Sequence, residues 1–360
     1  MSDSPFSLRA VIGLTAAGVI ALTACGEAPE DDDEGGNGEA EATDFTACLV
    51  SDEGGWDDQS FNQSAYQGIQ DAEEGLGVDY QTAESHQESD FGPNVDSMVQ
   101  QGCDLTFGVG YMLEDAINDA ALENEDLNFG LIDSTLPDDP ENGKAMVFNT
   151  AEASYLAGYL AAAMSETETV ATFGGGAIPS VTVFMDGFAD GVDRYNDDND
   201  ADVQLLGWDK DAQDGVFTGD FSDQSAGRAQ TEQFLSQGAD IVMPVAGPVG
   251  LGAAAAVEED GEAKLIWVDT DGYESTAYGD IILTSVVKQI PQAVYDTIEE
   301  GVNGEFTSEP YVGDLENEGV GLAPFHDFED EVSDELKEEI DQLTEEIISG
   351  ETVVESENAP

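Results

Sequence analysis

The residues that follow the first apolar strand of the chain have the side chains of a small-molecule binding loop. The run at residues 45–50 is apolar, a pair of glycines comes soon after it, and a helix-like stretch begins near Ser60. Open α/β sheets bind ligands at such loops, between the carboxyl end of a strand and the amino end of a helix. Asp52 can accept hydrogen bonds, and Phe61 offers a stacking face beside the amide of Asn62. An ordinary helix start, with Ser60 as N-cap and Phe61 as a buried staple residue, would use the same residues.

Three further charged residues have positions that suit ligand contact. Asp133 and Asp269, like Asp52, fall at the carboxyl ends of predicted strands, although an aspartate at a loop of so acidic a chain is often just solvated. If the last of these strands ends two residues later, Asp271 replaces Asp269. Lys288 lies in an apolar run, where an unpaired ammonium would be costly, so either a salt bridge or a ligand must hold it.

Short apolar strands that alternate with helical patterns predict parallel, doubly wound sheets with helices on both faces. The predicted strands are 45–50, 103–109, 128–132, 145–148, 170–173, 203–208, 241–245 and 265–268, with a further crossing strand at 283–288. The predicted helices are 60–75, 94–101, 113–123, 151–164, 181–195, 224–237 and 249–258.

This body of the chain is too long for one compact core, and its pattern repeats in two lobes of the same α/β type. Two such lobes joined by crossing strands, with a ligand cleft between them, describe a type I periplasmic-binding-protein fold. We expect lobe 1 at 45–149 and about 286–325, lobe 2 at 150–285, and an acidic terminal helix and tail at 326–360. The stripe Leu336, Ile340, Leu343 and Ile347 predicts that helix.

The start of the chain predicts export and lipid anchoring. Residues 1–24 contain one cation and an apolar run too short to span a bilayer, which is typical of a signal peptide. The sequence Leu-Thr-Ala-Cys ending at Cys25 resembles a lipobox, so we expect lipidation of Cys25. A plain secretory signal is the alternative. Residues 25–44 are acidic and contain no aromatic side chain, which predicts a disordered tether.

The charge of the chain excludes several classes of partner. Eighty acidic residues against eight Lys and Arg give a net charge of -72, and removal of residues 1–24 leaves it unchanged. Phosphate backbones and anionic lipid surfaces require clustered cations, so nucleic acid is not an expected partner. Such a surface is typical of a halophilic protein, because molar salt shortens the Debye length to about 3 Å and screens self-repulsion.

Cysteine and histidine usage limits metal chemistry. Cys48 and Cys103 begin neighbouring predicted strands, so a disulfide between them is possible, and two buried free thiols are the alternative. His86 and His326 are scattered, and no zinc-type spacing is present. We therefore expect neither a metal nor a cofactor.

An ordered set of motifs resembles the BMP family of ABC-transporter substrate-binding lipoproteins, the purine nucleoside receptor group. The set comprises the loop at 51–68, Phe-Gly-Leu-Ile-Asp at 129–133, Glu-Ala-Ser-Tyr-Leu-Ala-Gly-Tyr-Leu-Ala at 152–161, Ala-Gly-Pro-Val-Gly-Leu-Gly at 246–252, Trp-Val-Asp-Thr-Asp at 267–271 and Leu-Thr-Ser-Val-Val-Lys at 283–288. The resemblance implies a membrane-anchored protein on the extracytoplasmic face that gives a purine nucleoside to an ABC transporter permease.

The same resemblance implies the roles of individual residues. Phe61 should stack on the base, Asn62 and Asp133 should recognise its edge, Asp269 and Lys288 should hold the ribose, and Gly247 should admit the ligand close to the backbone. For the second stacking aromatic, the chain departs from the family pattern. Phe221 lies in the family-like Gly-Asp-Phe-Ser-Asp segment after an added loop, and Trp208 lies at a strand end, while either can also be a packing residue.

Other functions fit the sequence less well. The chain has no Gly-x-Ser-x-Gly elbow, Walker loop or His-Glu-x-x-His helix, and three glycines at 174–176 lack dinucleotide-loop spacing, so we do not expect an enzyme. A sugar or another small ligand in the same cleft, and a surface sensor or adhesin lipoprotein, remain alternatives.

Overall fold

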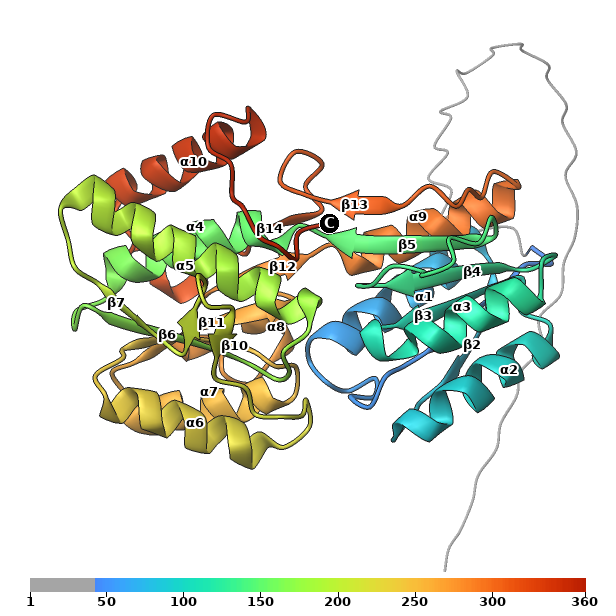
Figure 1. Cartoon of the computed structure of the whole chain (residues 1–360), viewed down its shortest axis with the longest axis horizontal. Helices are drawn as coiled ribbons and strands as arrows, with labels where there is room; N and C mark the ends of the chain where they lie inside the picture. The colour runs from blue at the N-terminus through green and yellow to red at the C-terminus, as the bar shows by residue number, and fades with distance from the viewer. Residues whose placement is uncertain (1–42) are drawn as a thin grey trace, which may run out of the picture. The chain divides into compact units, whose positions relative to one another are not determined.

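The structure, a computed structural model, describes residues 43–360. The predicted signal peptide, Cys25 and almost all of the tether lie outside these residues. The described residues form two α/β lobes, each built on a six-stranded sheet. Figure 1 shows the first lobe on the right and the second on the left.

The first lobe has an entirely parallel sheet covered by helices on both faces. Its strand order is β13 (Tyr311–Gly313), β5 (Gly143–Phe148), β4 (Asn128–Ile132), β3 (Leu105–Val109), β1 (Thr46–Val50) and β2 (Asp79–Ala83). Its helices are α1 (Phe61–Leu76), α2 (Phe91–Gln101), α3 (Glu114–Glu123) and α9 (Ile290–Asn303). Helices α1 and α9 pack together on one face, and α2 contacts α3 on the other.

The second lobe repeats this plan with one antiparallel edge strand. Its strand order is β14 (Val320–Leu322), β12 (Ile282–Lys288), β11 (Lys264–Asp269), β10 (Ile241–Val245), β6 (Thr169–Gly174) and β7 (Gln204–Leu206). Its helices are α4 (Thr150–Met164), α5 (Pro179–Asn199), α6 (Gln224–Ser236), α7 (Val249–Asp260), the short α8 (Gly272–Ser275) and α10 (Asp334–Ile348). A small hairpin is formed by β8 (Trp208–Asp209) and β9 (Asp214–Gly215).

The chain crosses between the lobes three times, which is the topology of the predicted type I periplasmic-binding-protein fold. It passes from β5 to α4, from β12 to α9, and from β13 to β14. The strand β14 pairs with β12, so the chain is back in the second sheet at Val320. These crossings leave the carboxyl ends of the parallel strands facing the space between the lobes (Figure 1).

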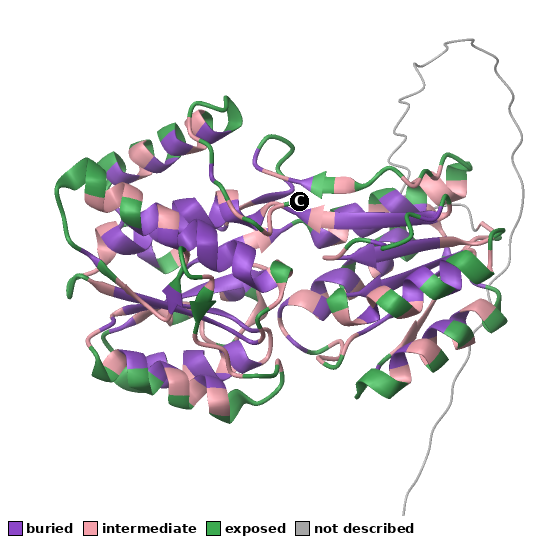
Figure 2. Cartoon of the chain, viewed as in Figure 1, coloured by how far each residue is buried: buried purple, intermediate pink, exposed green. Residues whose placement is uncertain are grey.

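Burial follows the alternation seen in the sequence. Figure 2 shows buried strands inside each lobe and exposed residues on the outer sides of the helices. Helices α4 and α5 pack closely, since a Cβ at Gly191 would lie 2.0 Å from the carbonyl oxygen of Tyr155. The predicted apolar stripe of α10 is confirmed, since all of its residues are buried.

Two local outcomes go beyond the sequence patterns. Cys48 and Cys103 form a disulfide between residues 5.9 Å apart at Cα, so the free-thiol alternative is wrong. The predicted strand at 203–208 is divided, because Gly207 takes a left-handed backbone with φ of 90° and separates β7 from β8. This turn changes where Trp208 lies.

Candidate functional site

A cavity lies between the lobes where the strand ends meet. It encloses about 600 Å³ of space between atoms, part of which is open to solvent. The residues that the sequence analysis proposed for ligand binding all line it except Trp208. They are Asp52, Phe61, Asn62, Asp133, Phe221, Gly247, Asp269 and Lys288.

The first binding loop is held by its own polar side chains. Asn62 donates from Nδ2 to Oδ1 of Asp52 at 2.7 Å and to Oδ2 of Asp58 at 3.1 Å. Asp52 also accepts the N–H of Gly54 at 2.9 Å, and its own N–H donates to Asn62 Oδ1 at 3.3 Å. Asp58 accepts backbone N–H groups at the start of α1, so it caps this helix in place of the expected Ser60. The loop therefore has a fixed form with one side on the cavity.

Burial dominates the electrostatics of this loop. It raises the pKa of Asp52 to about 6, against the lowering effect of the hydrogen bonds from Gly54 and Asn62. Burial likewise raises the pKa of Asp58. Asp52 lines the cavity, and with this pKa its carboxyl group takes up a proton at mildly acidic pH.

Lys288 is the central cation of the cavity. Its Nζ lies 2.5 Å from Oδ2 of Asp133 and 3.2 Å from Oδ1 of Asp269, and all three side chains are nearly buried. Burial alone would lower the pKa of Lys288, but the two carboxylates raise it above its ordinary value. Lys288 therefore forms the salt bridge that the sequence analysis gave as the alternative to ligand contact, and it also lines the cavity. Strand β11 ends at Asp269, so Asp271 is not needed in this role.

Both partner aspartates have unusual backbone geometry. The φ of Asp133 is 66° and that of Asp269 is 71°, in the left-handed region that side-chain-bearing residues seldom adopt. Asp133 directly follows strand β4 and Asp269 ends strand β11, and the carboxylates of both pair with Lys288. The same backbone region is also adopted by non-glycine residues away from the cavity, such as Asp139 and Asp200, so it is the contact with Lys288 that marks these two aspartates.

Aromatic rings reach the cavity from both lobes. Phe61 comes from α1, and the Nζ of Lys288 lies 5.3 Å from its ring centroid and 4.8 Å from that of Phe184 on α5. Phe221 comes from the loop before α6 and packs on Gly175, where a Cβ would lie 2.4 Å from the ring. Phe61 and Phe221 thus line one cavity from opposite lobes.

Trp208 lies elsewhere. It is buried in the second lobe, its indole N–H donates to Asp186 at 3.0 Å, and its ring packs edge-on against Phe217. It does not line the cavity. Gly247 does, with a left-handed φ of 52° that a side chain would strain.

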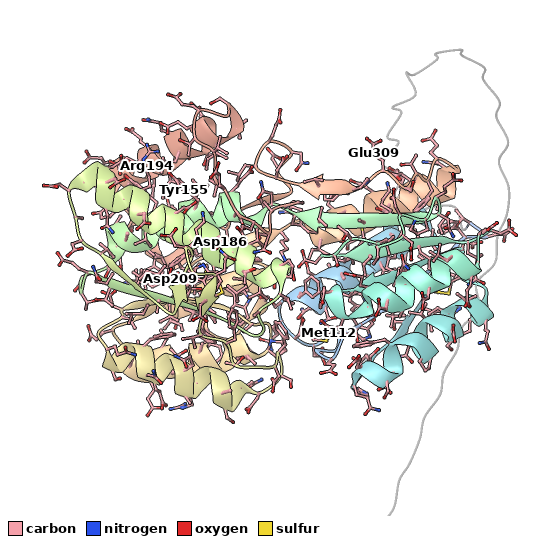
Figure 3. All side chains as sticks on the ribbon, viewed as in Figure 1. Met112, Tyr155, Asp186, Arg194, Asp209 and Glu309 are labelled. Atoms are coloured by element: carbon pink, nitrogen blue, oxygen red, sulfur yellow. A yellow bond between two sulfur atoms is a disulfide. The ribbon has the colours of Figure 1, made fainter. Side chains whose placement is uncertain are left out.

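Several residues of the site were not singled out in the sequence. Met112, labelled in Figure 3 on the side of the first lobe that faces the second, lines the cavity together with Tyr111, Ser180 and Phe184. They follow strands β3 and β6, so the strand-end rule could have indicated them, but their side chains carry no distinctive chemistry. The rule alone does not separate them from other loop residues.

Direct hydrogen bonds also join the lobes beside the cavity. The carbonyl oxygen of Gln59 accepts from the Trp267 indole at 3.3 Å, from Thr270 at 3.3 Å and from Ser275 at 3.2 Å. Next to it, the hydroxyl of Ser60 donates to Oδ2 of Asp269 at 2.8 Å. The first binding loop therefore contacts the second lobe directly.

Two features are absent from residues 43–360. In this range no helix has the length and apolarity needed to cross a bilayer. The same residues contain no cluster of three or more His, Cys, Asp and Glu side chains placed to hold a metal ion.

Comparison with known proteins agrees with this geometry. The family model described as ABC transporter substrate-binding protein PnrA-like matches residues 45–358, which confirms the resemblance drawn from the motifs. The ABC transporter nucleoside-binding protein BmpA of Lactococcus lactis is 31% identical, with 96% of this chain and 98% of that protein covered. Basic membrane protein A of Borreliella burgdorferi is 30% identical, with 84% of this chain and 86% of that protein covered.

Solved structures show the same fold. A solute-binding protein of an ABC transporter system from Aeropyrum pernix has a TM-score of 0.78 at 24% identity, over 87% of this chain and 94% of its own. A second, from Conexibacter woesei, has a TM-score of 0.69 at 21% identity, over 88% of this chain and 100% of its own. The predicted type I periplasmic-binding-protein fold is confirmed.

Proposed function

The chain belongs to the family of PnrA-like substrate-binding proteins of ABC transporters, and from this premise we propose that it captures a purine nucleoside in the cleft between its lobes. It then delivers this ligand to an ABC transporter permease. Its relatives are substrate-binding proteins, so the prediction of a binding protein rather than an enzyme is confirmed.

One observation carries the choice of ligand: two aromatic rings and one buried ion-pair cluster line the same cavity. Phe61 and Phe221 come from opposite lobes, and a planar base between them would gain stacking energy of about 1–3 kcal/mol per ring. Lys288 and Asp269 supply a donor and acceptors at the same cavity, which suits the hydroxyls of a ribose. The name of the Lactococcus relative supports a nucleoside.

The edge of the base is assigned to Asn62 and Asp133. The amide nitrogen of Asn62 donates to two carboxylates of its own loop and its Oδ1 accepts the N–H of Asp52, which leaves the second lone pair of Oδ1 for a donor on the base. Lys288 engages Oδ2 of Asp133, which leaves Oδ1 to accept from the ligand. Both side chains thus act as acceptors, which favours bases with N–H groups on that edge.

Calorimetric titration tests the assignment. The protein in molar salt is titrated with inosine, guanosine, adenosine, guanine and ribose, and we expect nucleosides to bind far more tightly than ribose. Failure to bind any nucleoside, or tight binding of ribose alone, would reject the purine nucleoside and leave the family assignment intact. Native mass spectrometry of protein purified in high salt provides a second measurement, because a copurified nucleoside adds its own mass.

The lipid anchor is a separate part of the proposal. It depends on the sequence before Cys25 and on the acidic stretch that follows. A Cys25→Ser variant should appear in the medium or remain uncleaved, because it has no thiol for lipidation. Unchanged fractionation of this variant with the membrane would contradict the anchor but not the ligand.

A further inference from the structure

The segment after α10 does not project away from the protein. Residues 349–360, here called the tail, run back across the second lobe and stop between the two lobes (Figure 1). Within the tail, Val354 is buried with an exposed fraction of 8%. The sequence analysis predicted an acidic tail but not where it lies, so this docking is a property of the fold.

The first anchors of the tail are cations of the second lobe. The guanidinium of Arg194, labelled on α5 in Figure 3, lies 3.4 Å from the Thr352 hydroxyl. The ammonium of Lys210 donates to the carbonyl oxygen of Glu355 at 2.5 Å and pairs with Asp190 at 2.6 Å. The protein has only eight Lys and Arg, so two of them here represent a substantial share of its positive charge.

The strongest anchor is a buried carboxylate. Asp186 is fully buried, and it accepts from the Ser356 hydroxyl at 2.7 Å, from the Trp208 indole at 3.0 Å and from Gln213 at 2.9 Å. A buried carboxylate requires such donors, so the tail completes the hydrogen bonding of Asp186. This arrangement also gives Trp208 a role, because it helps hold the carboxylate that receives the tail.

Beyond these anchors the tail forms one side of a second cavity. Residues 357–360 line it opposite Glu114 and Ser134 of the first lobe. Tyr111, Asp133 and Ser180 line both this second cavity and the principal cavity. The two cavities therefore adjoin, and the tail lines the second cavity but not the ligand cavity.

We propose that residues 357–360 are a wall of the ligand cleft that determines which nucleosides fit. The inference rests on the proposed function, because it takes the ribose to lie beside Lys288 and Asp269. A group attached to the ribose would extend past Asp133 into the second cavity, where the tail limits its size. Glu114, Asp133 and Glu357 supply carboxylates there, and the described lining has no Lys, Arg or His. The cleft therefore admits an unsubstituted nucleoside and rejects a nucleoside 5′-phosphate.

Two variants separate size from charge. A chain that ends at Ser356 removes the wall and keeps the anchor at Asp186, whereas Glu357→Gln removes one charge and keeps the wall. Both are titrated with inosine, with inosine 5′-monophosphate and with an inosine that carries a neutral 5′-methylthio group. The shortened chain should raise the affinity for the neutral extended ligand relative to inosine by about tenfold, and Glu357→Gln should improve only the phosphate. The proposal would be overturned if, in both variants, the affinities for the two extended ligands relative to inosine equalled those of the unaltered protein.

A measurement without ligand separates this proposal from the nucleoside assignment. A cysteine introduced as Ser134→Cys lines the second cavity, and its rate of reaction with a bulky maleimide reports how far the tail covers it. The rate should rise at least several-fold in the shortened chain. Val353→Ala, a change at a tail residue that is 71% exposed, serves as the matched control and should leave the rate unchanged. Protein without the introduced cysteine corrects for any background reaction.

The two measurements give distinct outcomes. If no nucleoside binds but labelling accelerates in the shortened chain, the proposed function fails and the tail remains a wall of the cleft. If the labelling rate is the same with and without residues 357–360, the tail does not cover the cleft and the proposal is wrong, whatever the titrations show.

Discussion

The Nζ atom of Lys288 lies 2.5 Å from Oδ2 of Asp133, a residue 155 positions away in the sequence. Lys288 ends strand β12 of the second sheet, and Asp133 follows strand β4 of the first, so this ion pair joins the two lobes within the ligand cavity. Asp269 holds the same ammonium from the second lobe. A ligand hydroxyl that enters must share these partners, which couples binding to the contact between the lobes.

We predict that Lys288→Met costs stability as well as affinity. The substitution leaves Asp133 and Asp269 buried without a cation, and removal of one partner of a buried pair typically costs about 3–5 kcal/mol. Urea unfolding in molar salt measures the loss, and adding Asp133→Asn should recover part of it. In titrations the folded variant should lose affinity for nucleosides and keep its affinity for guanine. Equal losses for nucleoside and free base would show that Lys288 does not contact the ribose.

We predict that Phe61→Ala and Phe221→Ala each weaken binding of every base. Each removes one stacking face, so the loss should be about 1–3 kcal/mol for adenosine, guanosine and inosine alike. Trp208→Phe is the matched control, because it alters a buried aromatic residue outside the cavity. Calorimetric titration compares the three variants. A loss with Trp208→Phe as large as that with Phe221→Ala would mean that Phe221 is not the second stacking ring.

Asp52 should make stability depend on pH near 6. Its pKa in the folded protein is raised to about 6 from the ordinary value of 3.8, so between these values the folded state binds more protons than the unfolded state. Its contribution is fully present below about pH 4 and is lost as the pH rises through about 6. Asp52→Asn should therefore flatten the decline of the unfolding free energy between pH 4 and 7 by on the order of 2 kcal/mol. Parallel urea-unfolding profiles for the two proteins across this range would be evidence against a raised pKa of Asp52 in the folded protein.

The protein should be more stable in molar salt than in dilute buffer. Its net charge of -72 repels itself, and the Debye length shrinks from about 10 Å at 0.1 M to about 3 Å at 1 M salt. The melting temperature should therefore rise markedly with sodium chloride. Chloride is the suitable salt because sulfate also strengthens apolar burial. A melting temperature that does not change with chloride would mean that the carboxylates lie too far apart to repel each other.

Much of the fold could be predicted because its signals are local. Most of the strands and helices follow from apolar runs and helical periodicity, and the apolar stripe of α10 is an example in which every predicted residue is buried. The strand β2 was missed, because its sequence Asp-Tyr-Gln-Thr-Ala is polar and only the edge of the sheet stabilises it. The helix α9 was also not predicted as an element, although its region was assigned to the first lobe.

The cavity-lining residues could be predicted as far as the strand-end rule reaches. Asp52, Asp133 and Asp269 follow buried strands, and parallel strands present their carboxyl ends at one edge, so the sequence placed all three at the cavity. The choice between Phe221 and Trp208 could not be made in this way. Gly207 turns the chain so that Trp208 points to Asp186, and no pattern along the sequence reports that turn.

The sequence by itself determined which residues could bind a ligand, the α/β class and the charge of the surface, because each follows from residue type and local spacing. The tertiary structure decided which groups meet. It selected Asp133 and Asp269 for Lys288 from among eighty acidic residues, joined Cys48 to Cys103, and brought the tail to the cleft. The physical reason is that such contacts depend on the order of the strands and the paths of the crossing segments, and these are set by packing of the whole chain.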